Sequence, residues 1–284
     1  MSHTAVPSTR FARTAGLAAQ FAGGWNRVGR QTQFYVYTLR SIGDALANYR
    51  VELQRQVAQM ALGTGALVLI GGTVVIVGFL TMSAGALVAV QGYNALASVG
   101  VDALVGFVSA FVNVRLGAPL IATVGLAATI GAGATAQLGA MRINEEIDAL
   151  EVMGVRSVAF LASSRVIAGV IVVIPLYSVA LLTSFVASQV VVAMYGQSSG
   201  VYNHYFTTFL NPVDMLWSVL LVVFSGVVVM LVHTYYGYTA SGGPAGVGEA
   251  VGRAVRASLV IAVFVILFAS LAIYGHTGNF HLAE

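Results

Sequence analysis

The stretch LGAPLIATVGLAATIGAGATAQLGAM, residues 116–141, contains no charged side chain. A helix that crosses a bilayer needs about 20 predominantly apolar residues, so this stretch is long enough for one span. Four more stretches are apolar over a similar length, at residues 61–90, 166–195, 214–236 and 255–275. The sequence therefore predicts an all-α integral membrane protein with five transmembrane helices.

The amino-acid composition excludes a water-soluble domain and several kinds of chemistry. Hydrophobic residues make up 58% of the chain and charged residues only 8%, whereas soluble domains carry about 25% charged residues. The absence of cysteine excludes disulfides and zinc-thiolate sites. All 13 basic residues are arginine, so the chain lacks the lysine of a P-loop ATPase. We expect these arginines to face an anionic lipid leaflet, not nucleic acid.

The arginines also predict how the chain is oriented in the cell (inner or plasma) membrane. Cytosolic segments carry an excess of arginine and lysine, and five spans with a cytosolic N-terminus place 12 of the 13 arginines inside. Only Arg115 then lies outside, and the C-terminus is extracytoplasmic. Residues 103–114 are apolar but short. They are expected to form an outer half-helix or an outward extension of the second span.

The segments outside the spans differ in character. Residues 1–26 are expected to form a cytosolic tail and residues 277–284 an extracytoplasmic tail, on either side of a transmembrane domain at 59–276. Residues 27–58 are expected to contain an amphipathic helix in the membrane interface, with packing on a soluble partner as the alternative. Its apolar side chains recur at steps of three and four: Tyr35, Leu39, Ile42, Leu46, Tyr49 and Leu53.

The second span carries a stripe of small side chains. Ala128, Ala132, Ala136 and Ala140 repeat every four residues, so they share one face of a helix. Small residues let helix backbones approach each other closely in a membrane. The stripe therefore predicts close packing, either within the chain or at a tightly packed dimer seam.

The stretch TAQLGAMRINEEIDALEVMGVR, residues 135–156, concentrates acidic residues between the second and third spans. A short helix at about 143–152 would place Ile143, Ile147, Leu150 and Gly154 on one side. The remaining face would be acidic, formed by Glu145, Glu146, Asp148 and Glu151. Such a helix suits docking into a partner's groove, although the residues alone equally allow a solvated acidic loop.

This stretch resembles the coupling-helix signature of the MlaE/YrbE permease family of ABC lipid transporters. The resemblance covers roughly residues 60–275, and the pair Glu145-Glu146 makes it most similar to YrbE subunits of actinobacterial Mce loci. Supporting positions include Arg115 with Pro119, Gln137-Leu138-Gly139, Arg165 through Ala168, Pro175, and Tyr236-Gly237. The chain departs from the family at Thr129 and Gln137, where many members carry arginine and glutamate, and also at Leu116 and Ser164.

The resemblance implies a permease subunit without bond chemistry of its own. Its implied partners are a second YrbE-like permease chain, an ABC ATPase dimer that binds the ATP, and an MCE-protein hexamer. Glu145, Glu146, Asp148, Leu150 and Glu151 are then expected to couple to the ATPase. We expect no metal and no cofactor in this chain. Its cargo is expected to be a hydrophobic lipid that passes between an MCE tunnel and the cell membrane or cytosol.

Arg115 is the one candidate for a lipid head-group contact, because a guanidinium can bind a phosphate or carboxylate bidentately. Snorkelling to the interface is the alternative. Two other functions compete with transport: a membrane scaffold that anchors MCE proteins, and a membrane-embedded lipid-processing enzyme. The scaffold predicts that ATPase inactivation leaves lipid uptake unchanged, and the enzyme predicts turnover by the purified chain.

Overall fold

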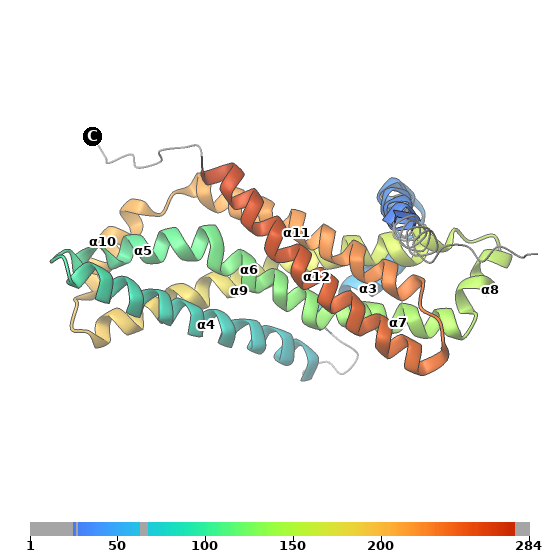
Figure 1. Ribbon diagram of the computed structural model, residues 1–284, viewed down its shortest axis with the longest axis horizontal. Coiled ribbons are helices and arrows are strands. Elements are labelled where there is room, and N and C mark those ends of the chain that lie inside the picture. Colours follow the sequence, from blue (N-terminus) through green and yellow to red (C-terminus); the bar gives the residue numbers. More distant parts are fainter. Residues whose placement is uncertain (1–24, 27, 63–67, 276–284) are drawn as a thin grey trace, which may run out of the picture.

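Five long helices form the body of the protein (Figure 1). The computed structural model describes residues 25–26, 28–62 and 68–275; both predicted tails lie almost wholly outside these residues. Each of the five helices is long and apolar enough to cross a membrane, which confirms the predicted fold class and the number of spans. The membrane-spanning helices are Gly72–Ala97, Asp102–Ile143, Val158–Met194, Pro212–Tyr238 and Gly243–Tyr274.

Residues 103–114 form the first part of the second span. They belong to α5 (Val105–Val112) and continue without a break through α6 (Ala118–Gly125) into α7 (Ala132–Ile143). Two π-helical turns, Asn113–Gly117 and Leu126–Gly131, join these pieces. The short apolar run is therefore an extension of the second span and not a separate half-helix.

Two spans begin at different residues from those expected. α4 (Val68–Ala97) lies further along the chain than 61–90, because residues 61–62 still belong to α3 (Arg50–Leu62). α12 (Gly243–Tyr274) starts well before residue 255. The part of the helix before and around residue 255 carries Glu249, Arg253 and Arg256. Because the expected span was a largely uncharged run, it began only at residue 255.

The first and third spans pack so closely that a glycine is required between them. A Cβ on Gly85 of α4 would lie 2.4 Å from the backbone oxygen of Ser184 in α9 (Ser164–Met194). Ser188 donates a hydrogen bond to the Gly85 carbonyl at 2.9 Å, and the hydroxyls of Thr81 and Thr183 lie 2.7 Å apart. Polar side chains thus join the two helices where apolar side chains would gain nothing over lipid.

The amphipathic N-terminal segment is helical, but in three pieces. A helical segment at 28–40 is followed by α2 (Ile42–Asn48) and α3 (Arg50–Leu62). In Figure 1 the first of these, in blue, is seen nearly end-on and so runs across the direction of the spans. Across the three pieces, the buried side chains are mostly polar and are not those of the predicted apolar stripe. They are Thr38, Ser41, Ala45, Glu52 and Gln56.

Several apolar residues of this segment are exposed instead. Val36, Tyr37, Leu39, Leu46 and Val51 each expose 41% or more of their surface. Leu39 and Leu46 belonged to the stripe expected to share one environment. The segment therefore meets the spans through polar residues together with Tyr35 and Met60, which pack on the main core, and leaves other apolar side chains exposed.

Candidate functional site

A short helix projects from one end of the bundle, at the right of Figure 1. This helix, α8 (Glu146–Val152), joins α7 to the third span. Ile147 anchors it, because its side chain is fully buried against Leu138 and Leu161, and the half-buried Leu150 packs on the same cluster. The helix is shorter than the predicted 143–152. Ile147 and Leu150 of the expected apolar side turn inward, whereas Ile143 ends α7 and Gly154 is exposed beyond the helix.

The four acidic residues of α8 are not equivalent. Asp148 accepts a hydrogen bond from Arg142 at 2.6 Å, and Glu151 accepts from the hydroxyls of Ser157 and Tyr238 at 2.6 and 3.0 Å. Glu146 has only a long contact with the Asn144 amide, at 3.4 Å. For Glu145 no partner is found within the described part of the chain. Glu145 and Glu146 are thus the acids most available to another molecule.

Glu145 also has an unusual backbone conformation. Its φ of 60° makes it the one described non-glycine residue with a positive φ. Side chains with a Cβ avoid this left-handed region, and holding one there costs about 1–3 kcal/mol. The left-handed residue lies between the end of α7 and the start of α8, where the chain changes direction.

The exposed surface of α8 is not purely acidic, and here the sequence analysis was incomplete. Val152 and Met153 expose 88% and 69% of their surface at the end of the helix. Neither was assigned to the apolar side of the predicted helix. Together with Glu145 and Glu146 they form what we call the α8 tip: two free carboxylates at the start of the helix and an exposed apolar pair at its end.

The base of α8 is tied to the N-terminal helices. Arg156 forms an ion pair with Asp44 of α2 at 2.5 Å. Tyr238, which holds Glu151, also packs against Phe34, with ring centroids 5.3 Å apart. A displacement of α8 would therefore reach the N-terminal segment as well as the spans.

The alanines and glycines of the second span face opposite ways. Ala128 and Ala140 are exposed, and Ala132 and Ala136 are half-buried. Gly131 and Gly139 instead face inward, where a Cβ would lie 2.6 Å from the His233 ring and 2.9 Å from Val247. Gly131 and Gly139 serve packing within the chain, whereas the alanine stripe lies on the surface of the single chain together with the exposed Gly133.

Arg115 lies at the end of the bundle opposite α8. Its Nε and Nη2 both donate to Asp214 of α11 (Pro212–Tyr238), at 3.1 and 2.7 Å. The guanidinium carbon stands 4.0 and 4.5 Å from the ring centroids of Phe111 and Tyr274. An open cavity of about 570 Å³ lies beside it, with Trp217 in its wall. Sequence analysis gave Arg115 no partner within the chain, so the pairing with Asp214 was missed.

The geometry can be compared with known proteins at this point. Residues 63–272 match the family model described as Permease MlaE. The chain belongs to the MlaE permease family. A probable ABC transporter permease protein of Rickettsia bellii is 27% identical over 195 residues, which cover 66% of this chain and 72% of that protein. A second, from Synechocystis, is 29% identical over 187 residues, covering 63% and 69%.

A plant protein is also similar to this MlaE-family chain. TRIGALACTOSYLDIACYLGLYCEROL 1, chloroplastic, of Arabidopsis thaliana is 29% identical over 182 residues, which cover 62% of this chain and 52% of that protein. The family and the five spans make this chain a multi-pass membrane permease, a transporter component. The small α8 helix lies inside the matched region, as do Arg115 and the alanine stripe.

Proposed function

We propose that this chain is the permease subunit of an ABC-type, Mce/Mla-like lipid transporter. Membership of the MlaE family and the permease names of its relatives support the transporter class. The name of the plant relative, which is that of a glycolipid, favours a lipid as cargo. The subunit moves lipid between an MCE-protein tunnel on the outer side and the cell membrane or cytosol.

The α8 tip is the proposed contact with a separate ATPase, and it is the observation that carries the mechanism. A projecting helix with a buried anchor at Ile147 transmits a push to α7 and α9, which it joins. Val152 and Met153 offer an apolar contact, and desolvated apolar residues supply most interface energy. Glu145 and Glu146 fix the register, because charge pairs contribute more to specificity than to affinity. ATP binding by the ATPase then reshapes the spans by preferring one of their arrangements.

The alanine stripe is the proposed seam with a second YrbE-like permease chain. Its members are exposed or half-exposed in the single chain, and small side chains permit the close approach of a second backbone. Gln137 lies on this exposed face, whereas Thr129 is satisfied within its helix by the Gly125 carbonyl at 2.6 Å. The seam is therefore uncharged over this stretch.

The N-terminal helices are proposed to lie in the cytosolic membrane interface. The exposed Val36, Tyr37 and Leu39 can enter the apolar boundary while Arg40 stays among head groups. This places α8 in the cytosol and Arg115 near the outer surface, where the MCE hexamer is proposed to dock. A head-group contact for Arg115 requires the lipid to approach a guanidinium that Asp214 already holds.

Copurification and lipid uptake test the proposal together. The chain is expressed with its neighbouring genes, and the bound proteins and lipids are identified by mass spectrometry. We expect an ATPase and a second permease chain, and uptake of a labelled lipid that stops when the ATPase is inactivated. Replacing Val152 and Met153 with aspartate should remove the ATPase and leave the second permease chain bound. Uptake that survives ATPase inactivation would support the scaffold instead.

A further inference from the structure

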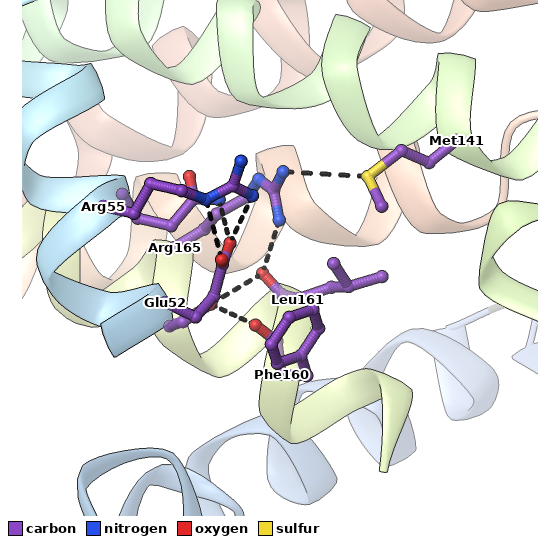
Figure 2. A network of polar contacts seen from close by, with 8 residues as sticks. Glu52, Arg55, Met141, Phe160, Leu161 and Arg165 are labelled. Atoms are coloured by element: carbon purple, nitrogen blue, oxygen red, sulfur yellow. Dashed lines mark hydrogen bonds and ion pairs between the residues drawn. The ribbon is translucent and has the colours of Figure 1, made fainter. Parts of the chain in front are cut away.

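Arg165 is a buried cation whose donors are poorly satisfied (Figure 2). It lies in the first turn of α9 and exposes only 2% of its surface. Nη1 donates to the Leu161 carbonyl at 3.0 Å, and Nη2 faces the weakly accepting Met141 sulfur at 3.9 Å. Nε is buried without a partner. A buried charge normally requires a counter-ion and a full set of hydrogen bonds.

Glu52 of α3 is the candidate counter-ion for Arg165. It exposes only 8% of its side chain, yet its hydrogen bonds are all local to α3. Arg55 donates to it from Nε and Nη2 at 2.8 and 2.9 Å, and Gln56 donates at 2.6 Å. Figure 2 shows the Arg55 and Arg165 side chains converging on the Glu52 carboxylate, although the hydrogen bonds of Glu52 come from Arg55 and Gln56 and none comes from Arg165.

The same cluster contains an unused acceptor. The Oε1 atom of Gln56 is buried without a partner, as is the Nε–H of Arg165. One acceptor on α3 and one donor on α9 are therefore both buried without a hydrogen-bond partner. A displacement of α3 that brought Gln56 Oε1 and Arg165 Nε within hydrogen-bond distance would satisfy both atoms.

We infer that Glu52 is an exchangeable counter-ion with two stations, Arg55 on its own helix and Arg165 on the third span. In the first station, seen here, the carboxylate is held by Arg55, which is 65% exposed. In the second, the carboxylate and Gln56 Oε1 move to the guanidinium of Arg165. The exchange lets α3 shift against α9 without leaving a buried carboxylate unpaired, which would be strongly destabilising. Glu52 is thus a positioning residue for the interfacial helices.

The position of Arg165 along the chain favours such a two-state contact. The π-helical turn Val158–Ser163 directly precedes α9 and follows the loop after α8. A π turn holds one more residue than an α turn and commonly marks functional sites. Its conversion to an α turn would rotate the start of α9 by roughly 100° relative to the segment before it. A movement of α8 can therefore present Arg165 to α3 differently. This inference does not depend on the cargo or on ATPase binding.

A cysteine reporter tests the exchange in the full chain, in its membrane. The chain contains no cysteine, so Met60→Cys introduces a single thiol where α3 packs against the main core. Its labelling rate by a maleimide measures how firmly α3 is seated. The rate is compared in four backgrounds: unchanged, Arg55→Gln, Arg165→Met, and both together. Arg50→Gln is the matched control, because Arg50 is on the same helix but bonds only the Leu46 carbonyl.

Each single loss should leave Glu52 one station, so labelling should change by less than about twofold. The double loss should raise labelling by about tenfold more than the product of the single changes, because coupled residues show non-additive effects of this order. Adding Glu52→Gln to the double variant should restore protection. The second station would be overturned if the labelling rate of the double variant were simply the product of the two single changes. It would also be overturned if Arg55→Gln alone labelled as fast as the double variant. Labelling that stays high after Glu52→Gln would equally overturn it, since the damage would then not be the unpaired carboxylate.

Discussion

Arg115 and Asp214 lock the end of the bundle opposite α8 through an ion pair of 2.7 Å between Nη2 and Oδ2. The two side chains are 11% and 14% exposed, and they join the second span to the fourth. Tyr274, from the fifth span, stacks on the guanidinium and donates to the Asp214 carbonyl at 3.3 Å. One charged pair therefore holds three spans together at this end.

Asp214→Asn should destabilise the fold by leaving this guanidinium without its counter-charge. Breaking a fully buried pair costs about 3–5 kcal/mol, and the residual exposure here should bring the loss to the lower end of that range. The measurement is the thermal midpoint of the purified protein in detergent. Asp102→Asn is the control. Asp102 lies at the same end, but its long-range hydrogen bond, from Gln197 at 3.4 Å, is accepted by its backbone carbonyl and not by its side chain.

The double variant Arg115→Met/Asp214→Leu separates structure from lipid contact. It removes both charges, which is often neutral for folding, so the thermal midpoint should recover toward that of the wild type. If Arg115 also contacts a lipid head group, uptake should remain low in this folded variant. Full uptake would show that the arginine serves the bundle alone.

The predicted topology can be measured with reporter fusions. Fusions after residue 200 and at the C-terminus should report the outer side, and fusions near residues 150 and 245 should report the cytosol. The physical reason is the distribution of arginines, of which only Arg115 is expected outside. A cytosolic C-terminus would contradict five spans with the proposed orientation.

The spans were predictable because hydropathy depends on the sequence alone. The number of spans followed from uncharged runs. A short helix between the second and third spans followed from the spacing of Ile147 and Leu150, although Ile143 is the last residue of α7 and not part of that helix. The length of the fifth span did not follow, because Glu249, Arg253 and Arg256 extend the helix into polar surroundings. Charge marks where a helix leaves the membrane and not where the helix ends.

Tertiary contacts could not be predicted in the same way. Periodicity identified an apolar stripe near the N-terminus, but the face against the spans is formed by Thr38, Glu52 and other polar residues. The pairing of Arg115 with Asp214 joins residues 99 positions apart, a separation that no local pattern reports. The available signal was that few acids occur near spans, and an acid in or beside a membrane is usually paired.

Seating of α3 should weaken in acid. Burial alone would raise the pKa of Glu52, but hydrogen bonds from Arg55 and Gln56 and the charges of Arg55 and Arg165 outweigh it and lower the pKa below its ordinary 4.5. A lowered pKa stabilises the folded state above pH 4.5, and that stability is lost as the pH falls through the folded value. Hydrogen exchange of α3 peptides, corrected for intrinsic rates, should therefore accelerate below pH 4.5. Glu52→Gln should lack this acceleration.

The alanine stripe and the inward glycines should respond differently to added bulk. Ala132→Leu or Ala136→Leu should leave the single chain stable, because these side chains are only half-buried, yet weaken assembly with a second permease chain by about 1–3 kcal/mol. Light scattering after size-exclusion chromatography measures the assembly. Normal assembly and uptake would mean that the stripe faces lipid.

Gly131→Ala and Gly133→Ala are the matched pair for this test. A Cβ on Gly131 would lie 2.6 Å from the His233 ring, whereas a Cβ on Gly133 meets nothing within 4 Å. Gly131→Ala should lower the thermal midpoint of the single chain, and Gly133→Ala should not. Equal effects of the two would contradict the division of this span into an inner and an outer face.

The α8 tip permits a substitution in which stability and function move in opposite directions. Glu145 holds a left-handed backbone with φ 60°, a conformation that glycine adopts without steric cost. Glu145→Gly should therefore fold at least as stably as the wild type, but it removes one of the two free carboxylates. If that charge pairs with the ATPase, copurification of the ATPase and lipid uptake should both fall while the thermal midpoint holds or rises.

Charge reversal at Glu145 and Asp148 extends this prediction. Removing one partner of a buried interfacial charge pair costs on the order of 2–5 kcal/mol, so Glu145→Arg should abolish ATPase association. Asp148→Arg should have the smaller effect, because Asp148 already pairs with Arg142 in an exposed contact. Glu249→Arg is the control, as an exposed acid at the same end that pairs only along its own helix with Arg253. If Glu145→Arg keeps full ATPase association and uptake, the α8 tip is only a solvent-exposed surface, and Glu145 has no role in coupling.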